Sequence, residues 1–250
     1  MKKIVLKINN LKKNYHTKKE EIKAIDNISF EVYEKEILAI VGPSGCGKST
    51  LLSIIANLDE KSSGNIEKIN ITSIGYMLQN DSLFPWLTIL DNTLIGLDVK
   101  KNKTKENINN VNNLLEKYGL AEFKNVYPTS LSGGMRQRVA LIRTLATNPN
   151  LLLLDEPYSA LDYQTRLALS NDMYRIIKEE NKTAIMITHD IGEAISMADR
   201  VIVLSKRPCT IKKIYEIKLD NKKDPINNRK DNKFNYYYEK IWRDLDVHIN

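Results

Sequence analysis

A glycine-rich stretch early in the chain combines the residue types that bind phosphate. Residues 42–50, GPSGCGKST, match the pattern G-x-x-x-x-G-K-[ST] between an apolar run and a helix-like segment. Backbone N–H groups of such a loop turn toward phosphate oxygens, and the helix N-terminus adds partial positive charge. Lys48 is expected to reach the β- and γ-phosphates, and Ser49 to ligate Mg²⁺. The predicted nucleotide-binding residues are Gly42, Pro43, Ser44, Gly45, Cys46, Gly47, Lys48, Ser49 and Thr50.

Two adjacent carboxylates follow a continuous apolar run, LLLLDEP, at residues 151–157. Asp155 is expected to join Ser49 around the metal, and Glu156 to polarise the attacking water. An apolar run followed by acids is, on its own, equally typical of a strand end capped by charge. The phosphate loop in the same chain favours the catalytic interpretation.

Further polar residues follow strand-like runs or flank them. His189 comes after TAIMIT, and Gln79 ends IGYMLQ. Because parallel strands deliver their C-terminal ends to one crevice, we expect both residues beside the nucleotide. Gln79 is predicted to orient water or Mg²⁺. Tyr15, in KKNYH, is typical of an ordinary surface tyrosine when considered alone.

A second glycine pair suggests another anion cradle. In LSGGM, residues 131–135, Ser132, Gly133 and Gly134 precede an apolar, arginine-containing helical pattern. A single ATP site does not need two phosphate cradles.

The segments that carry these motifs alternate between strand and helix patterns. This alternation predicts an α/β protein with a largely parallel sheet. Between Asn80 and Asn150 the strand patterns vanish and helical periodicity replaces them. Residues 220–233, rich in Asn and Lys, are predicted to be a loose linker, and residues 234–245 a short amphipathic helix. Buried central strands are predicted at 37–42, 151–155, 183–188 and 200–205, and a half-exposed strand at 29–33.

Bulk composition narrows the class of protein. The 250 residues are 42% hydrophobic and 28% charged, and no apolar run approaches the ~20 residues of a membrane span. The start has no apolar region of signal-peptide length, so we expect a cytoplasmic protein. The two cysteines, Cys46 and Cys209, have no metal-ligand spacing and are expected to be reduced bystanders.

The net charge of +7 is unevenly distributed, with +5 falling in residues 206–250. A nucleic-acid binder more often spreads basic charge over a defined face, so no nucleic-acid partner is expected. The basic tail favours proximity to an anionic membrane surface.

Together the motifs resemble the ATP-binding cassette (ABC) ATPases over nearly the whole chain. They follow the family's order, and LSGGM is the most specific because other phosphate-loop NTPases lack it. The resemblance implies a RecA-like core with a parallel sheet, an antiparallel β subdomain and an inserted α-helical subdomain. The expected divisions are residues 1–79 and 148–205 for the core with the β subdomain, 80–147 for the helical subdomain, and 206–250 for a C-terminal extension.

The resemblance also explains the second cradle. In this family two cassettes form a head-to-tail dimer with two ATP molecules between them, and the signature loop contacts the γ-phosphate bound by the other subunit. A homodimer of this chain is therefore implied. The residues implied to act in this way are Leu131, Ser132, Gly133, Gly134 and Met135.

Other roles carry over residue by residue. Tyr15 would stack on adenine, and Gln79 would join the Mg²⁺ ligands Ser49 and Asp155 and couple that site to the helical subdomain. Glu156 would be the general base, and His189 would hold γ-phosphate and water. Asp162, in SALD, would communicate across the dimer. Two departures from the family pattern are Lys35 in place of a turn glycine and Lys61 in place of a proline, and the stretch from Gly64 to Gln79 is short.

Within the family, the chain is most similar to the ATPases of nitrate, sulfonate and taurine importers. Pro85 and Trp86, in NDSLFPWLTILDNT, match a sequence that recurs in that group, as do DEPYSALDYQTR and THDIGEAISMADRVIVLSKRP. Residues 79–92 would then receive a separate membrane permease, which works with an extracytoplasmic solute-binding protein. This implies a peripheral position at the cytoplasmic face of the membrane. Two alternatives remain open: Pro85 and Trp86 form only a buried turn, or the ATPase serves an exporter or another membrane machine.

Overall fold

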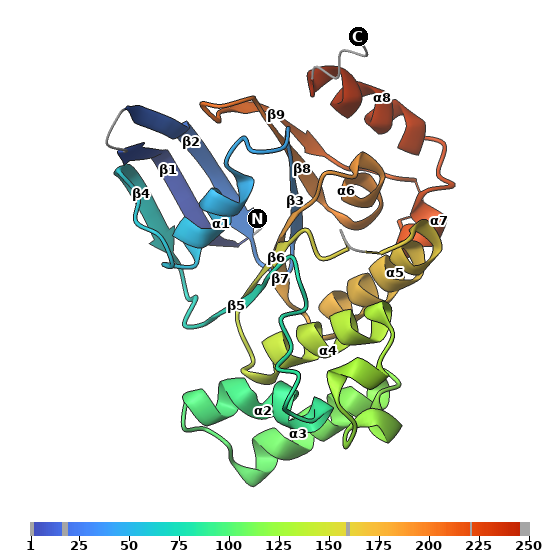
Figure 1. Ribbon diagram of the computed structural model, residues 1–250. Coiled ribbons are helices and arrows are strands. Elements are labelled where there is room, and N and C mark those ends of the chain that lie inside the picture. Colours follow the sequence, from blue (N-terminus) through green and yellow to red (C-terminus); the bar gives the residue numbers. More distant parts are fainter. Residues whose placement is uncertain (1–2, 17–19, 159–160, 221, 246–250) are drawn as a thin grey trace.

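The computed structural model describes residues 3–16, 20–158, 161–220 and 222–245, arranged around two sheets (Figure 1). The larger sheet has six strands in the order β5-β6-β7-β3-β8-β9, and all neighbours are parallel except β8 and β9. The expected mostly parallel sheet is therefore confirmed. Its strands are β3 (Ile37–Val41), β5 (Ile74–Met77), β6 (Leu151–Asp155), β7 (Thr183–Ile187), β8 (Arg200–Leu204) and β9 (Ile211–Glu216).

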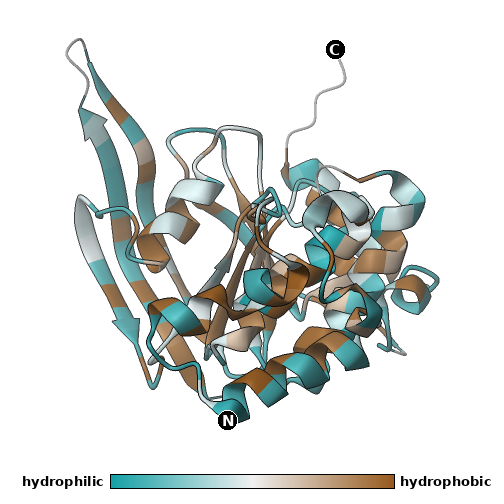
Figure 2. Cartoon of the chain, turned by 60° about the horizontal axis from the view of Figure 1, so that its bottom comes forward, coloured by the Kyte–Doolittle hydropathy of each residue, from teal (hydrophilic) through white to brown (hydrophobic). Residues whose placement is uncertain are grey.

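A smaller antiparallel sheet lies against one side of this core. Its strand order is β2-β1-β4, and the two long strands alternate between buried and exposed residues. Figure 2 shows this alternation as brown and teal bands along the strands at the left. Residues 29–33, predicted as a half-exposed strand, end β2. The strands are β1 (Ile4–His16), β2 (Glu21–Tyr33) and β4 (Ser63–Lys68).

The central strand β3 separates two hydrophobic clusters. Its five residues are all buried, as expected for a parallel strand covered on both faces. Ile37, Ala39 and Val41 pack with residues of the helices that follow β6 and β7, whereas Leu38 and Ile40 pack with the antiparallel sheet. The alternation of side chains along one strand thus joins both halves of the core.

Helices account for the stretch that lacks strand patterns. Figure 1 shows α2, α3 and α4 grouped below the β5 end of the sheet. Among the described residues, no helix is both long enough and apolar enough to cross a membrane. The helices are α1 (Lys48–Ile55), α2 (Ile89–Val99), α3 (Lys105–Lys117), α4 (Gly133–Ala146), α5 (Tyr163–Glu179), α6 (Ile191–Met197), α7 (Pro225–Asn228) and α8 (Phe234–Asp244), with 3₁₀ turns η1 (Ala121–Phe123) and η2 (Pro128–Ser130).

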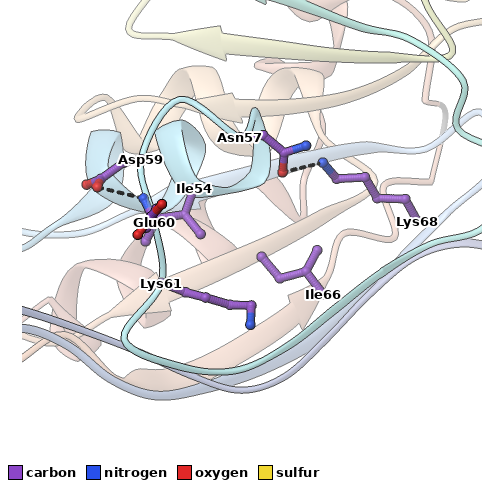
Figure 3. A pocket seen from close by; sticks show the side chains of 7 residues that line it. All are labelled: Ile54, Asn57, Asp59, Glu60, Lys61, Ile66 and Lys68. Carbon is purple, nitrogen blue, oxygen red and sulfur yellow. Dashed lines mark hydrogen bonds between the residues drawn. The ribbon is translucent and has the colours of Figure 1, made fainter.

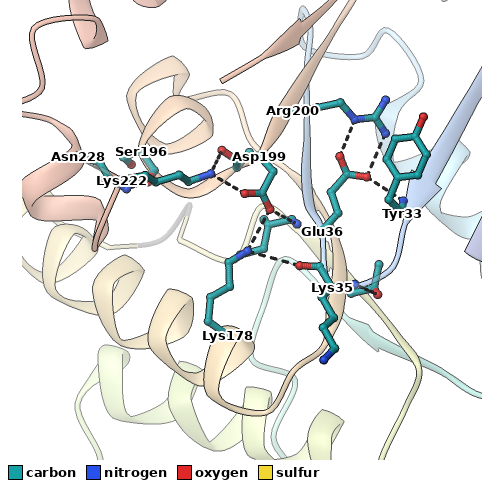
Figure 4. A network of polar contacts seen from close by, with 12 residues as sticks. Tyr33, Lys35, Glu36, Lys178, Ser196, Asp199, Arg200, Lys222 and Asn228 are labelled. Carbon is teal, nitrogen blue, oxygen red and sulfur yellow. Dashed lines mark hydrogen bonds and ion pairs between the residues drawn. The ribbon is translucent and has the colours of Figure 1, made fainter. Parts of the chain in front are cut away.

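The prediction of a loose linker at 220–233 is wrong. Residues 225–228 form α7, and the buried side chain of Asn228 donates a hydrogen bond to the carbonyl of Ser196, 2.7 Å away. The Lys222 ammonium binds the Ala198 carbonyl and the Asp199 carboxylate, both at 2.7 Å (Figure 4). The polar composition that suggested a linker instead supplies polar contacts to the core. The helix predicted at 234–245 is confirmed as α8.

The turn before β3 holds a lysine in a backbone conformation that favours glycine. Lys35 has φ +60°, a left-handed conformation in which a side chain is disfavoured. The next residue, Glu36, is buried and pairs with Arg200 through both carboxylate oxygens, at 2.5 and 3.0 Å (Figure 4). This ion pair ties the start of β3 to the neighbouring strand β8.

Candidate functional site

The phosphate loop connects β3 to α1 and is folded around its own lysine. Gly45 and Gly47 have φ +70° and +126°, which explains the need for glycine at both positions. The Lys48 ammonium donates hydrogen bonds to the carbonyls of Gly42 and Pro43, at 2.8 and 3.0 Å. A buried ammonium held by backbone carbonyls is positioned to exchange these partners for phosphate oxygens.

A segment of the predicted C-terminal extension supports this loop. The guanidinium of Arg207 donates to the carbonyl of Gly45 at 2.7 Å. Cys46 and Cys209 are both buried free thiols, and the hydrogen bond from Cys209, aided by the charge of Lys48 and opposed by burial, lowers the pKa of Cys46. The contact between the two cysteines was not expected, because most of the chain separates them in sequence.

The metal end of the predicted site brings two oxygen ligands together. Ser49, in the first turn of α1, donates a hydrogen bond to Asp155 Oδ1 at 3.0 Å. Burial raises the pKa of Asp155. The charge of a bound cation would oppose this effect, because it favours the ionised carboxylate. Hydroxyl and carboxylate oxygens suit Mg²⁺, which commonly takes only one or two protein ligands beside phosphate. Tyr76, which sequence reasoning missed, donates to the other oxygen of Asp155 at 3.2 Å.

Three predicted residues meet at the carboxylate of Glu156. The amide of Gln79 and Nδ1 of His189 lie 3.4 and 3.2 Å from the same oxygen, Oε2. Glu156 itself has φ +46°, an uncommon conformation for a residue with a side chain and one that concentrates at functional sites. The strand ends of β5, β6 and β7 therefore converge as the parallel topology predicts.

A buried acid near His189 was also missed. Glu193, in α6, accepts a hydrogen bond from the Thr188 hydroxyl at 2.6 Å, and Asp190 caps the same helix. Burial raises the pKa of Glu193 to about 7. These bonds fix the turn that carries His189. A buried acid within a helix has no periodic signature in sequence, so its role is visible only in the fold.

Tyr15 lies beside α1, the helix that follows the phosphate loop. Its hydroxyl donates to Asp59 at 2.8 Å and lies 3.5 Å from the hydroxyl of Thr50, while its ring remains partly exposed. This position suits a ring that stacks on a base, and it distinguishes Tyr15 from a surface tyrosine without neighbours.

Asp59 also borders a hollow of about 650 Å³ between the end of α1 and β4 (Figure 3). Lys61 and Lys68 line it together with two isoleucines. None of the phosphate-loop residues from Gly42 to Thr50 contributes to this hollow. It is therefore separate from the surface that would receive phosphate.

The signature residues lie at the start of α4. Ser132 is the N-cap, and its Oγ accepts a hydrogen bond from the N–H of Met135 at 3.3 Å. Leu131 is buried, and a Cβ at Gly133 would lie 3.0 Å from Leu161 Cδ2. No hydrogen bond among the described residues joins this loop to the phosphate loop of the same chain.

The neighbouring Asp162 caps α5 in the same way, through the N–H of Thr165 at 3.0 Å. Ser159 and Ala160, the first residues of SALD, lie outside the described residues.

The loop around Trp86 is held rigidly while its aromatic ring faces solvent. The buried Asn92 side chain accepts from the N–H of Phe84 at 2.8 Å, and its two amide hydrogens are shared among three loop carbonyls, each 3.0 Å from Nδ2. Trp86 is 69% exposed, and its ring lies 5.3 Å from that of Phe84. The alternative of a buried turn is therefore wrong for Trp86.

Comparison with known proteins points to one family. Residues 25–159 match the family model described as ABC transporter. The chain is 44% identical to the uncharacterized ABC transporter ATP-binding protein YtlC of Bacillus subtilis, over 96% of this chain and 95% of that protein. It is 39% identical to the aliphatic sulfonates import ATP-binding protein SsuB of Bacillus cereus, over 86% and 87%, and 39% identical to the nitrate import ATP-binding protein NrtD of Synechocystis, over 90% and 86%.

Among solved structures, the chain is similar to a dimeric post-hydrolysis state of the ATP-binding cassette MJ0796 bound to ADP and Pi. The TM-score is 0.73 at 32% identity, over 85% of this chain and 99% of that one. The likeness extends to sequence as well as backbone.

Proposed function

Since this chain belongs to the ABC transporter family and is an ATP-binding ATPase, we propose that it powers an importer of nitrate-, sulfonate- or taurine-type solutes. It would act as a head-to-tail homodimer bound to a membrane permease at the cytoplasmic face of the membrane. An extracytoplasmic binding protein would select the solute. The named importer relatives support the direction of transport.

The convergence of Gln79 and His189 on Glu156 is the observation that carries the catalytic part. Glu156 is the proposed general base, and a water between this carboxylate and the γ-phosphate would lose a proton to Oε2. His189 would hold that water and the γ-phosphate. Lys48 would bind the β- and γ-phosphates once it leaves the loop carbonyls. Bound Mg²⁺, held by Ser49 and Asp155 with Gln79 nearby, would neutralise phosphate charge.

Other residues are proposed to bind the adenine ring and to complete the site. Tyr15 would stack on adenine. The signature loop, with Ser132, Gly133 and Gly134, would close over the ATP of the second subunit. Asp162 would communicate across the dimer. The division into a core with a β subdomain, a helical subdomain from 80 to 147 and a C-terminal extension is part of this proposal.

The test of the catalytic part uses Glu156→Gln, which removes the base and keeps the side-chain shape. We expect unchanged ATP affinity, loss of turnover and ATP-dependent accumulation of dimer on size-exclusion chromatography. Glu122→Gln, on an exposed 3₁₀ turn, is the control and should behave as wild type. Wild-type turnover by the Glu156→Gln variant would exclude Glu156 as the base.

The transport part needs the permease. We expect co-purification of the chain with a multi-span permease and stimulation of its ATPase by a loaded solute-binding protein. Stimulation by a substrate offered only from the cytoplasmic side would instead identify an exporter.

A further inference from the structure

One guanidinium bridges the two loops on which the proposed mechanism depends. Arg136 lies in the first turn of α4. Its Nε donates to Asp81 Oδ2 at 3.0 Å, and its Nη1 donates to the carbonyl of Leu131 at 2.8 Å. Asp81 is two residues after Gln79, and Leu131 immediately precedes Ser132. The catalytic glutamine and the signature serine of one chain are thus connected through a single side chain.

A second arginine fixes the same loop to the same helix. Arg143 lies seven residues after Arg136 and therefore on the same face of α4. It donates to the carbonyls of Asp81 and Ser82 at 2.6 and 2.7 Å. The loop after Gln79 consequently follows α4, as the close approach of the two segments in Figure 1 shows. Only Arg136 also reaches the signature loop.

The pair formed by Arg136 and Asp81 is partly exposed to solvent. The side chains of Arg136 and Asp81 are 36% and 27% exposed. Ion pairs at such sites contribute little to the free energy of folding, because water solvates the separated charges well. The pair matters more for geometry than for folding stability. A planar guanidinium holds two acceptors at a fixed separation, and a lysine ammonium does not.

We propose that Arg136 is a positioning residue that couples the loop after Gln79 to the signature loop of the same chain. The inference rests on the proposed function, in which Ser132 contacts the nucleotide of the second subunit. When Gln79 changes partners as ATP or the permease binds, Asp81 moves with it. The guanidinium then moves the Leu131 carbonyl, and with it the position of Ser132.

The experiment measures dimerisation apart from hydrolysis. In the Glu156→Gln background we compare Arg136→Lys, Asp81→Asn and the double variant by analytical ultracentrifugation with ATP. Asp81→Asn retains the oxygen that accepts from the N–H of Leu83. Arg175→Lys, which replaces the arginine of an exposed ion pair on α5, controls for the exchange of residue type. Binding of a fluorescent ATP analogue to the monomer and the melting temperature are measured beside it.

Each single variant should raise the dimer dissociation constant about tenfold or more, since Ser132 is no longer held where the second subunit's nucleotide needs it. Nucleotide binding by the monomer and the melting temperature should stay at the parent's values. The double variant should be no worse than either single one, because both residues act through one link. Arg175→Lys should match the parent.

Two contrary outcomes are distinguishable. If the Glu156→Gln parent itself fails to dimerise with ATP, the proposed function falls, and this inference with it. If the parent dimerises and both single variants dimerise equally well, or if the dimer weakens only in step with the melting temperature, the coupling role alone is overturned. Asp81 lies on a loop, so its variant tests the link even if Arg136→Lys folds poorly.

Discussion

At the scale of single residues, burial determines the chemistry of Glu193. Its carboxyl group is almost fully enclosed and faces Arg166, Asp190 and His189. Burial is the dominant cause of its raised pKa, and the hydrogen bond from Thr188 opposes that effect. The folded protein therefore holds a proton that the unfolded chain releases between the usual pKa of 4.5 and about 7.

This difference makes the stability pH-dependent. Because the folded state binds more protons in that window, the contribution of Glu193 to the free energy of unfolding falls as pH rises from 5 to 8. Glu193→Gln removes the titration, so its stability relative to wild type should increase with pH, by at most about 3 kcal/mol. Urea unfolding at four pH values measures the difference, with the exposed Glu122→Gln as a control. A difference that is constant with pH would contradict the prediction.

Residues whose chemistry depends on sequence spacing were the most predictable. Sequence patterns predicted that Lys48 lies in a phosphate loop. They also predicted that Gln79, Glu156 and His189 lie at the ends of parallel strands. The fold brings the last three together. Tyr76 and Arg207 could not be predicted, because a tyrosine inside a strand and an arginine in a turn have many uses. Their contacts with the site arise only from tertiary packing.

At the scale of elements, the loop before α2 combines a fixed backbone with an exposed aromatic ring. Asn92 holds the loop, so removal of the Trp86 ring should leave it folded. Trp86→Ala should keep basal ATPase activity and weaken association with the permease, since exposed aromatic residues often anchor partner surfaces. Trp242→Ala, on the distant α8, is the matched control. Pull-down with the permease gives the comparison, and equal recovery of both variants would exclude Trp86 as an anchor.

The loop before α4 permits a complementation test. Ser132→Arg places bulk in the loop that is proposed to approach phosphate closely, and Lys48→Ala removes the charge that is proposed to bind phosphate. Each variant should be inactive alone. In a head-to-tail heterodimer one site carries both lesions and the other carries neither, so mixing should restore part of the activity.

ATP-driven dimerisation of the mixture is measured beside turnover, since coupling between sites can suppress hydrolysis in a mixed dimer. Normal hydrolysis by Ser132→Arg as a monomer would show that the signature loop does not act on a second subunit.

Elements with strong periodicity were predicted well, and the polar segment 220–233 was not. The central strands and α8 follow directly from apolar patterns. The segment with α7 has few apolar residues, yet Lys222 and Asn228 attach it to the core through buried carbonyls and a carboxylate. Composition records the lack of an apolar face, but it does not show which backbone acceptors a polar side chain will meet.

At the scale of the whole molecule, that attachment connects the C-terminal helices to the core. Asn228→Ala would leave the buried carbonyl of Ser196 without this partner, at a cost of about 1–3 kcal/mol. The melting temperature should fall by about 2–10 °C. Asn235→Ala, at an exposed position of α8, should have little effect. Differential scanning calorimetry compares the two, and equal melting temperatures would show that α7 is not a stabilising attachment.

The position of β3 in the sheet also determines when this strand acquires its neighbours during synthesis. The strand and its phosphate loop leave the ribosome early, yet both parallel neighbours, β7 and β8, come after the whole helical insertion. Until then five apolar residues have no strand beside them, a condition that favours aggregation and chaperone binding. The antiparallel pair β1 and β2 is local in sequence and can form first, covering Leu38 and Ile40 on one face. The nascent chain thus carries its phosphate-loop sequence long before the two strands that flank β3 in the folded sheet are synthesised.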